Sequence, residues 1–423
     1  MARIINKAGV IIRQRVVQNL GFQNLVGKSL GKGIFFLIQM LLAYYMSIEG
    51  FANYAIFWSL LRLYTFFGSN NFYILYFKEA RKTILNESRL PEKLIDNSII
   101  TYIAFSVLFF PATVLLFNSF YTAILLTLSA AGLIIIRIIA EVSKVDNSVR
   151  LSIFLEDFIL NLIIILFLFI AMTLHSSSFD SVVLAITSSL VIASLISLLA
   201  FKKKFNVSFS QIRILRSHLS YDDFKMGFRY TLLRSGEVIY NFAVRYLGKI
   251  FFGVLFVSYA HVMIQFFNIF SILTLAVISG LQSKIVLHRA THFTKKVVKK
   301  IYLSIIYILS PVIIVAALIF GVLNEDLIRW TFPKFEEFSH LLWWVAITGF
   351  IFSIFQPLIY IFIYNNKFPR INRFLIIQYL SLLILIVLPI FKLNQNIWLF
   401  GIMIIFPLCQ GIACLAWLKK SRA

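Results

Sequence analysis

Five polar side chains follow one another at helical spacing within the otherwise apolar stretch 226–253. They fall at steps of three and four residues, which places them in one stripe along a helix face at about 100° per residue. The stripe consists of Arg234, Glu237, Asn241, Arg245 and Lys249. A charge at the centre of a bilayer costs roughly 2.5 to 3.5 kcal/mol on insertion scales. Several charges on one face therefore predict that this face meets water or a polar ligand rather than lipid.

Polar side chains also occur at helical spacing in other apolar stretches. Arg62 lies within 52–77 and is expected to line a polar cavity, although so long a side chain can also extend to an interface. The other candidates for the cavity lining are Lys28, Lys32, Gln39, His261, Gln265 and Asn268. Lys28 and Lys32 lie near the predicted inner interface, where they can equally serve only as topology signals. His261 is more simply interpreted as a buried polar contact.

The charge within the apolar stretches is mostly positive, which favours an anionic ligand. Arginine suits a diphosphate because its guanidinium binds two oxygens at once. Glu237 lies three residues after Arg234, so the two can simply neutralise each other. Glu237 is also our candidate for ion coupling, since Arg234 could exchange this carboxylate for a phosphate. The coupling ion can be either a proton or sodium. We expect no metal and no cofactor, because His288 and His292 lie in a basic loop without a nearby carboxylate.

Composition explains why these charges lie in a membrane. The 423 residues are 60% hydrophobic and only 13% charged, with a mean hydropathy of +0.90, whereas soluble domains carry about 25% charge. We predict an all-α polytopic membrane protein of about twelve transmembrane helices, each near the roughly 20 residues that cross a bilayer. Their approximate limits are 33–50, 52–77, 98–118, 121–141, 152–174, 182–201, 226–248, 252–276, 301–323, 341–364, 373–391 and 397–418.

Basic residues set the predicted orientation. The formal net charge is +23, and with the N-terminus inside, 33 of the 40 Lys and Arg residues lie in inner segments. Such a bias places both termini in the cytoplasm. Contact of these inner basic residues with anionic membrane lipids also explains the positive net charge, so we expect no nucleic-acid partner. Residues 3–20 mix basic and apolar side chains and predict an amphipathic helix on the inner membrane face.

A polar interruption at 201–223 divides the predicted spans into six and six. We therefore predict two six-helix bundles around a central cavity, residues 1–204 with the amphipathic helix and residues 205–423. A shift of 205 residues supports a repeat, because it aligns the first span with the seventh and superposes five identical residues: Gly31, Leu42, Phe51, Tyr54 and Ala55 on Gly236, Leu247, Phe256, Tyr259 and Ala260. Parallel repeats of this kind are a transporter architecture with the substrate between the halves.

Two stretches also resemble a known family. LLAYYMSIEGFANYAIFWSLLRLYTFFG, with the tight turn between the first two spans, and RYLGKIFFGVLFVSYAHV in the seventh and eighth are similar to the polysaccharide transporters, best known as O-antigen flippases, of the multidrug/oligosaccharidyl-lipid/polysaccharide exporter superfamily. The resemblance implies a monomer in a bacterial inner membrane that moves an undecaprenyl-diphosphate-linked oligosaccharide, used for lipopolysaccharide O-antigen or a related surface glycan, to the outer leaflet. It also implies a glycan polymerase and chain-length proteins as partners, and a basic residue in the seventh span, where Arg245 stands.

Two alternatives remain open at this stage. A multidrug exporter of the same superfamily would favour acidic and aromatic cavity residues for its cationic substrates. A membrane-embedded enzyme, such as a glycan polymerase or an acyltransferase, would need a large outer loop, and the largest outer loop predicted here is 324–340. No phosphate-binding glycine-rich loop or nucleophile elbow occurs in the sequence. We therefore expect a transporter with no catalytic residues, not an enzyme.

Overall fold

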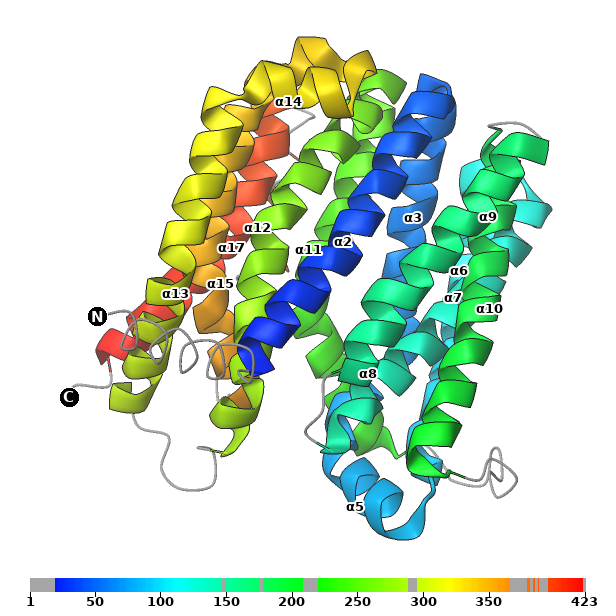
Figure 1. Cartoon of the computed structure of the whole chain (residues 1–423), viewed down its shortest axis with the longest axis vertical. Helices are drawn as coiled ribbons and strands as arrows, with labels where there is room; N and C mark the ends of the chain where they lie inside the picture. The colour runs from blue at the N-terminus through cyan, green and yellow to red at the C-terminus, as the bar shows by residue number, and fades with distance from the viewer. Residues whose placement is uncertain are drawn as a thin grey trace, which may run out of the picture. The chain divides into compact units, whose positions relative to one another are not determined.

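The computed structural model describes residues 20–146, 150–174, 178–207, 220–287, 295–365 and 395–420, with five further positions between 379 and 387. Within this part the chain is helical and forms no strand, as the all-α prediction requires (Figure 1). The α-helices are α2 (Leu20–Tyr45), α3 (Ile48–Ser69), α4 (Phe72–Leu75), α5 (Phe77–Glu87), α6 (Glu92–Phe117), α7 (Phe120–Val142), α8 (Arg150–Ile153), α9 (Leu160–Leu174), α10 (Phe179–Phe205), α11 (Tyr221–Phe252), α12 (Val254–Leu287), α13 (Lys295–Val322), α14 (Asn324–Thr331), α15 (Leu342–Asn365) and α17 (Gln395–Lys420). The shorter elements are η1 (Ser143–Asp146), η2 (Phe154–Ile159) and η4 (Pro333–Leu341).

The predicted spans that lie in these residues coincide with helices. Six helices of this part are long and apolar enough to cross a membrane, and a seventh results if the pair Leu309–Val322 and Asn324–Thr331, bent by 82°, counts as one span. The two helices α3 and α11 do not pass this test, because polar side chains within them lower their hydropathy. The predicted span 373–391 and the predicted amphipathic helix 3–20 lie outside the described residues, except for a few positions of the former.

The chain forms two compact units, 34–261 and 1–33 with 262–423. The first contains α3 to α11, the C-terminal part of α2 and the start of α12. In it α10 packs between α7 and α9, while α3 packs against α6, α7 and α11. In the other unit α15 packs against both α13 and α17, side by side in Figure 1. The domain limits predicted from the sequence, 1–204 and 205–423, remain a prediction.

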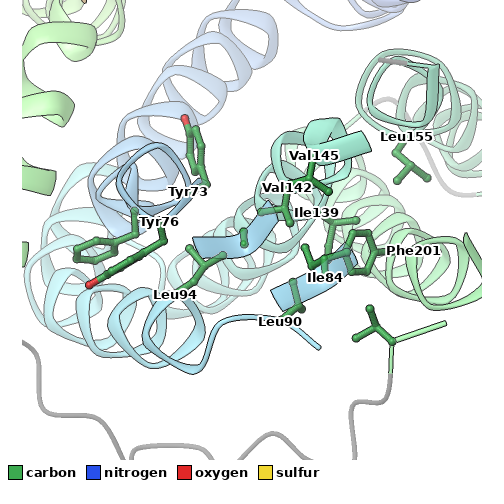
Figure 2. Packing of buried hydrophobic residues seen from close by; sticks show 13 residues of the cluster. Tyr73, Tyr76, Ile84, Leu90, Leu94, Ile139, Val142, Val145, Leu155 and Phe201 are labelled. Atoms are coloured by element: carbon green, nitrogen blue, oxygen red, sulfur yellow. The ribbon is translucent and has the colours of Figure 1, made fainter. Parts of the chain in front are cut away.

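A glycine allows α7 and α10 of the first unit to pack closely. A Cβ on Gly132 of α7 would lie 2.9 Å from the carbonyl oxygen of Leu190 in α10, so only glycine permits this approach. At one end of the same helices, apolar side chains of α4, α5, α6, α7 and α10 form a buried cluster that includes Tyr73, Ile84 and Phe201. Figure 2 shows these side chains meeting between the helices. The cluster fixes the segment that directly follows α3.

That segment begins with two buried asparagines in the left-handed conformation. Asn70 has φ 43° and Asn71 has φ 49°, so the predicted span 52–77 is not one continuous helix but ends at Ser69. Asparagine tolerates this conformation better than most residues, because its side chain can replace lost backbone hydrogen bonds. Asn71 Nδ2 donates to Thr231 Oγ1 of α11 at 2.9 Å, and Thr231 Oγ1 donates to Asn70 Oδ1 at 3.2 Å. The break in α3 is therefore also a polar junction with α11.

A second polar contact lies next to this junction. The hydroxyl of Tyr76 donates to Asp223 Oδ2 of α11 at 2.9 Å and accepts from Asn97 Nδ2 of α6 at 2.7 Å. One tyrosine thus joins three helices at the same end of α3. A Cβ on Gly227 of α11 would lie 2.9 Å from both Asn70 Nδ2 and Asn70 O, so this glycine allows the backbones to approach.

The predicted span 152–174 also contains an irregularity. Its first turns form the π-helix η2, which carries Glu156 and Asp157. A π-turn holds one more residue per hydrogen-bonded turn than an α-turn and often marks a functional region. Asp157 is buried, and its backbone carbonyl accepts from Asn161 Nδ2 at 2.6 Å. The sequence pattern gave no reason to single out these two carboxylates.

The junction between α3 and α11 leads to a prediction for stability. Thr231→Val keeps the shape of the side chain but removes the hydroxyl that donates to Asn70 Oδ1 and accepts from Asn71 Nδ2. The loss of a buried hydrogen bond costs about 1–3 kcal/mol when it leaves an acceptor such as Asn70 Oδ1 unsatisfied, so the apparent Tm of the purified protein in detergent should fall. Thr173→Val is the control, because the exposed Thr173 hydroxyl bonds only to its own helix. Equal Tm values for the two variants would contradict the proposed importance of the junction.

Candidate functional site

Arg245 is a buried cation near the end of α11. Its side chain is only 3% exposed. Its Nε–H donates to His261 Nδ1 of α12 at 3.0 Å, and Nη1 donates to the carbonyl oxygen of Asn241, one turn earlier, at 2.9 Å. Both partners are uncharged acceptors. In the part of the chain that the structure describes, Arg245 forms no ion pair with a carboxylate, so its charge is compensated by dipoles alone.

A chain of hydrogen bonds continues from Arg245 to two other helices. Because the guanidinium can only donate, Nδ1 of His261 must accept, and the imidazole is neutral with its proton on Nε2. That proton is donated to Gln39 Oε1 of α2 at 2.8 Å. Gln39 Nε2 then donates to the hydroxyl oxygen of Tyr54 of α3 at 2.8 Å. We call Arg245, His261, Gln39 and Tyr54 the guanidinium relay; it joins α2, α3, α11 and α12.

Rings pack around the relay and restrict its movement. The His261 ring meets Phe51 edge to face at a centroid distance of 5.2 Å and Tyr54 in the same way at 5.9 Å. Tyr54 in turn lies nearly parallel to Trp58 at 6.4 Å. Gln39 and His261 are fully buried. The side chains that hold Arg245 are therefore enclosed by aromatic residues.

Two polar atoms near Arg245 have no hydrogen-bond partner within the described part of the chain. They are the hydroxyl of Tyr240 and the side-chain oxygen Oδ1 of Asn241, and both are buried. Tyr240 lies within electrostatic range of Arg245 and of Glu237. A buried polar group without a partner costs about 1–3 kcal/mol. Such groups beside an unpaired guanidinium are typical of a surface that binds a polar ligand or water.

Arg62 forms the second cationic position, in the second half of α3, and is half-buried. Its electrostatic neighbours are Glu237 of α11, Arg137 of α7 and Glu156 of η2. Arg62 and Arg245 also lie within electrostatic range of each other. Neither Arg62 nor Glu237 takes part in an ion pair among the described residues. The structure thus brings Arg62, Arg245 and Glu237 together along the interface of α3 and α11.

The other residues of the predicted stripe have different surroundings. Lys249 is half-buried and donates from Nζ to Asn53 Oδ1 of α3 at 2.9 Å. Asn241 is buried and supplies the carbonyl that holds Arg245. The backbone of Arg234 belongs to α11, but its side chain lies outside the described part. The predicted exchange of Glu237 between Arg234 and a phosphate therefore remains a prediction.

The remaining sequence candidates lie in the other compact unit. Lys32 is exposed on α2, and the side chain of Lys28 is outside the described part. Gln265 is buried, and Asn268 Nδ2 donates to its Oε1 at 3.4 Å. The histidines 288 and 292 also lie outside the described residues. Lys28, Lys32, Gln265 and Asn268 stay as predictions for the cavity lining.

Several residues of the site were not predicted from the sequence. In the sequence Tyr54 and Tyr240 look like ordinary core aromatics. Their roles are indicated by their hydroxyls: that of Tyr54 accepts from Gln39, and that of Tyr240 has no partner among the described residues. Glu156, which belongs to the π-helix η2, is an electrostatic neighbour of Arg62. Two contacts involve charged residues of α7: Arg137 stacks on Phe66, with its guanidinium carbon 4.2 Å from the ring centroid, and Glu141 forms an ion pair with Lys144 of η1 at 2.8 Å.

The fold has known counterparts among transporters. An inward-facing multidrug resistance MATE family transporter of the MOP superfamily matches at 13% identity over 93% of this chain and 96% of that chain, with a TM-score of 0.67. An outward-facing MATE family transporter matches at 14% identity over 96% and 97%, with a TM-score of 0.61. The MATE multidrug transporter DinF-BH, solved as a complex, matches at 13% identity over 96% of both chains, with a TM-score of 0.62.

These matches define the class of fold: the chain has the all-helical fold of the MATE transporters. No protein-family model matches the chain, and no curated protein matches its sequence. The likeness extends over nearly the whole of each chain, so the transporter fold predicted from the sequence is confirmed. At 13–14% identity it carries no information on the substrate.

The unpaired charge of Arg245 leads to a prediction that separates function from stability. Arg245→Met keeps the apolar stem of the side chain but removes a buried charge that has no carboxylate partner among the described residues. Burying such a charge is costly, so its removal should offset the loss of the hydrogen bonds to His261 and Asn241, and the apparent Tm should equal or exceed that of the wild type. Arg137→Met is the comparison and should lower Tm, because it removes a cation–π contact worth about 0.5–2 kcal/mol. A large loss of Tm in Arg245→Met would assign Arg245 a structural role.

Proposed function

We propose that this protein is a flippase of the MOP superfamily, which moves a lipid-linked oligosaccharide diphosphate from the inner to the outer leaflet of a bacterial inner membrane by alternating access. The observation that carries the proposal is the pair of Arg62 and Arg245, cations on facing helices of an apolar protein. The neutral partners of Arg245 leave its charge available to an anion. The transporter fold supports movement of a substrate rather than its chemical conversion.

The chemistry of the proposed substrate suits this arrangement. A diphosphate needs cations, and arginine provides paired N–H donors for two phosphate oxygens. Sugars need hydroxyl and amide partners, which Tyr240 and Asn241 can offer. The polyprenol tail can remain in the lipid while the head group crosses. Glu237 lies near Arg62, so it can balance this cation when no substrate is bound. Binding of the coupling ion to Glu237 would then link the ion gradient to release of the substrate.

A second candidate is export of drugs, because the structural counterparts include a multidrug resistance transporter and the multidrug transporter DinF-BH. Hydrophobic cationic drugs require acidic groups in the binding site. In the described site the cations Arg62, Arg137, Arg245 and Lys249 outnumber the carboxylates Glu237 and Glu156. The positive charge thus favours the anionic substrate.

Complementation tests the proposal. A bacterial strain without its glycan flippase receives the wild type, Arg62→Ala, Arg245→Ala and the corresponding Lys variants, and surface glycan is measured at equal membrane abundance. We expect the wild type to restore the glycan and both Ala variants to lose at least about tenfold, since an interaction with a charged group is worth about 1.5–3 kcal/mol. Lys should restore part of the activity by keeping the charge.

Two controls complete this experiment. Lys225→Ala removes an exposed cation at the start of α11 and should leave surface glycan unchanged. An efflux-deficient strain that carries the wild type is exposed to cationic dyes in parallel. Resistance to dyes without restored glycan, in hosts with several different glycans, would support the drug exporter and contradict the flippase. Full activity of both Ala variants would show that the cations do not form the site.

A further inference from the structure

Arg245 is held at two of its three guanidinium nitrogens. A guanidinium has five N–H donors, and two are used, Nε–H toward His261 and one Nη1–H toward Asn241 O. The other three, one on Nη1 and two on Nη2, have no hydrogen-bond partner among the described residues. All five donors belong to one rigid plane, so the contacts that hold Nε and Nη1 also set the direction of the unused N–H groups.

The contact at Nε determines how the plane is oriented. A bond from Nη1 to a carbonyl of the same helix still allows the guanidinium to rotate about that bond. A second bond at Nε removes this rotation. The acceptor, His261 Nδ1, is itself fixed from the far side, because Nε2–H is bound to Gln39 Oε1 and Gln39 Nε2 is bound to Tyr54. The tautomer of His261 and the orientation of Arg245 are thus set by a single chain of hydrogen bonds.

We propose that His261 and Gln39 are positioning residues, which hold the guanidinium of Arg245 through its Nε–H and leave its unused N–H groups to an anion. The Tyr240 hydroxyl, buried without a partner in the described part of the chain and within electrostatic range of Arg245, is the second donor of this anion site. The inference rests on the proposed function, which supplies a diphosphate as the anion. It assigns His261 a role different from both a proton carrier and a simple core contact.

Substitutions of His261 can separate the two halves of the relay. Asn places its Oδ1 near the position of the histidine Nδ1, so His261→Asn keeps an acceptor for Arg245. Gln places its amide near the position of Nε2, so His261→Gln keeps the contact with Gln39 but loses the acceptor for Arg245. His261→Phe keeps the ring and loses both contacts. The exposed His340 provides the control His340→Phe.

The experiment measures binding of inorganic pyrophosphate to the purified full-length protein in detergent by calorimetry, at one fixed salt concentration. We expect Arg245→Ala, His261→Phe and His261→Gln each to weaken binding at least about tenfold, the loss expected for an oriented bond to a charged group. His261→Asn should recover most of the loss seen in His261→Phe. His340→Phe should bind as the wild type does.

A double variant tests whether His261 acts through Arg245. If it does, adding His261→Phe to Arg245→Ala causes no further loss, because the group that was positioned is already absent. Additive losses would overturn the positioning role. Wild-type binding in His261→Phe, together with a loss in Arg245→Ala, would also overturn it while leaving the proposed function intact.

Two further results would count against the site itself. If the wild type binds no pyrophosphate, Arg245 does not form an anion site, whatever the outcome of complementation. If Tyr240→Phe binds pyrophosphate as the wild type does, the hydroxyl is not a donor of the site. Failure of the proposed function is separate from both, because it would appear as missing surface glycan in the strain with the wild-type protein.

Discussion

A charge that cannot leave a low-dielectric environment must be satisfied by what surrounds it, and Arg245 imposes this constraint on four helices. Its guanidinium has neutral acceptors and no described carboxylate partner. The acceptor His261 must stay neutral, which in turn requires Gln39 in one orientation and Tyr54 as its neighbour. The positions of α2, α3, α11 and α12 in this unit are thus linked by the requirements of one cation.

The interface of α3 and α11 shows the same principle along its length. At one end Lys249 contacts Asn53, and Ser258 of the next helix contacts the carbonyl of Ile48. At the other end Asn71 contacts Thr231. Arg62 and Glu237 lie between these ends. Hydrogen bonds to uncharged acceptors therefore fasten both ends of the helix pair, whereas Arg62 and Glu237 between them form no ion pair in the described part.

The sequence allowed the helices and the polar stripe of α11 to be predicted, because both depend on local periodicity. The burial of Arg245 and the closeness of Arg62 and Glu237 follow from α3 and α11 being neighbours. Periodicity could not indicate that Gln39 meets His261, since 222 residues separate them. Nor could it indicate the break at Asn70, because an asparagine in an apolar run looks like any other polar residue of a helix. Composition alone predicted a membrane protein, whereas these pairings required the folded chain.

The π-helix η2 has a consequence for how the chain can change in length. Inserting one residue into an α-helix rotates all that follows by about 100° and turns its buried face outward. A π-turn already contains such an extra residue, and the helix that follows it is not rotated. Loss of one residue from Phe154–Ile159 would therefore convert the turn to an ordinary α-turn and leave the faces of α8 and α9 as they are. What would change is the direction of Glu156 and Asp157, so a single deletion there would redirect the carboxylates while preserving the scaffold.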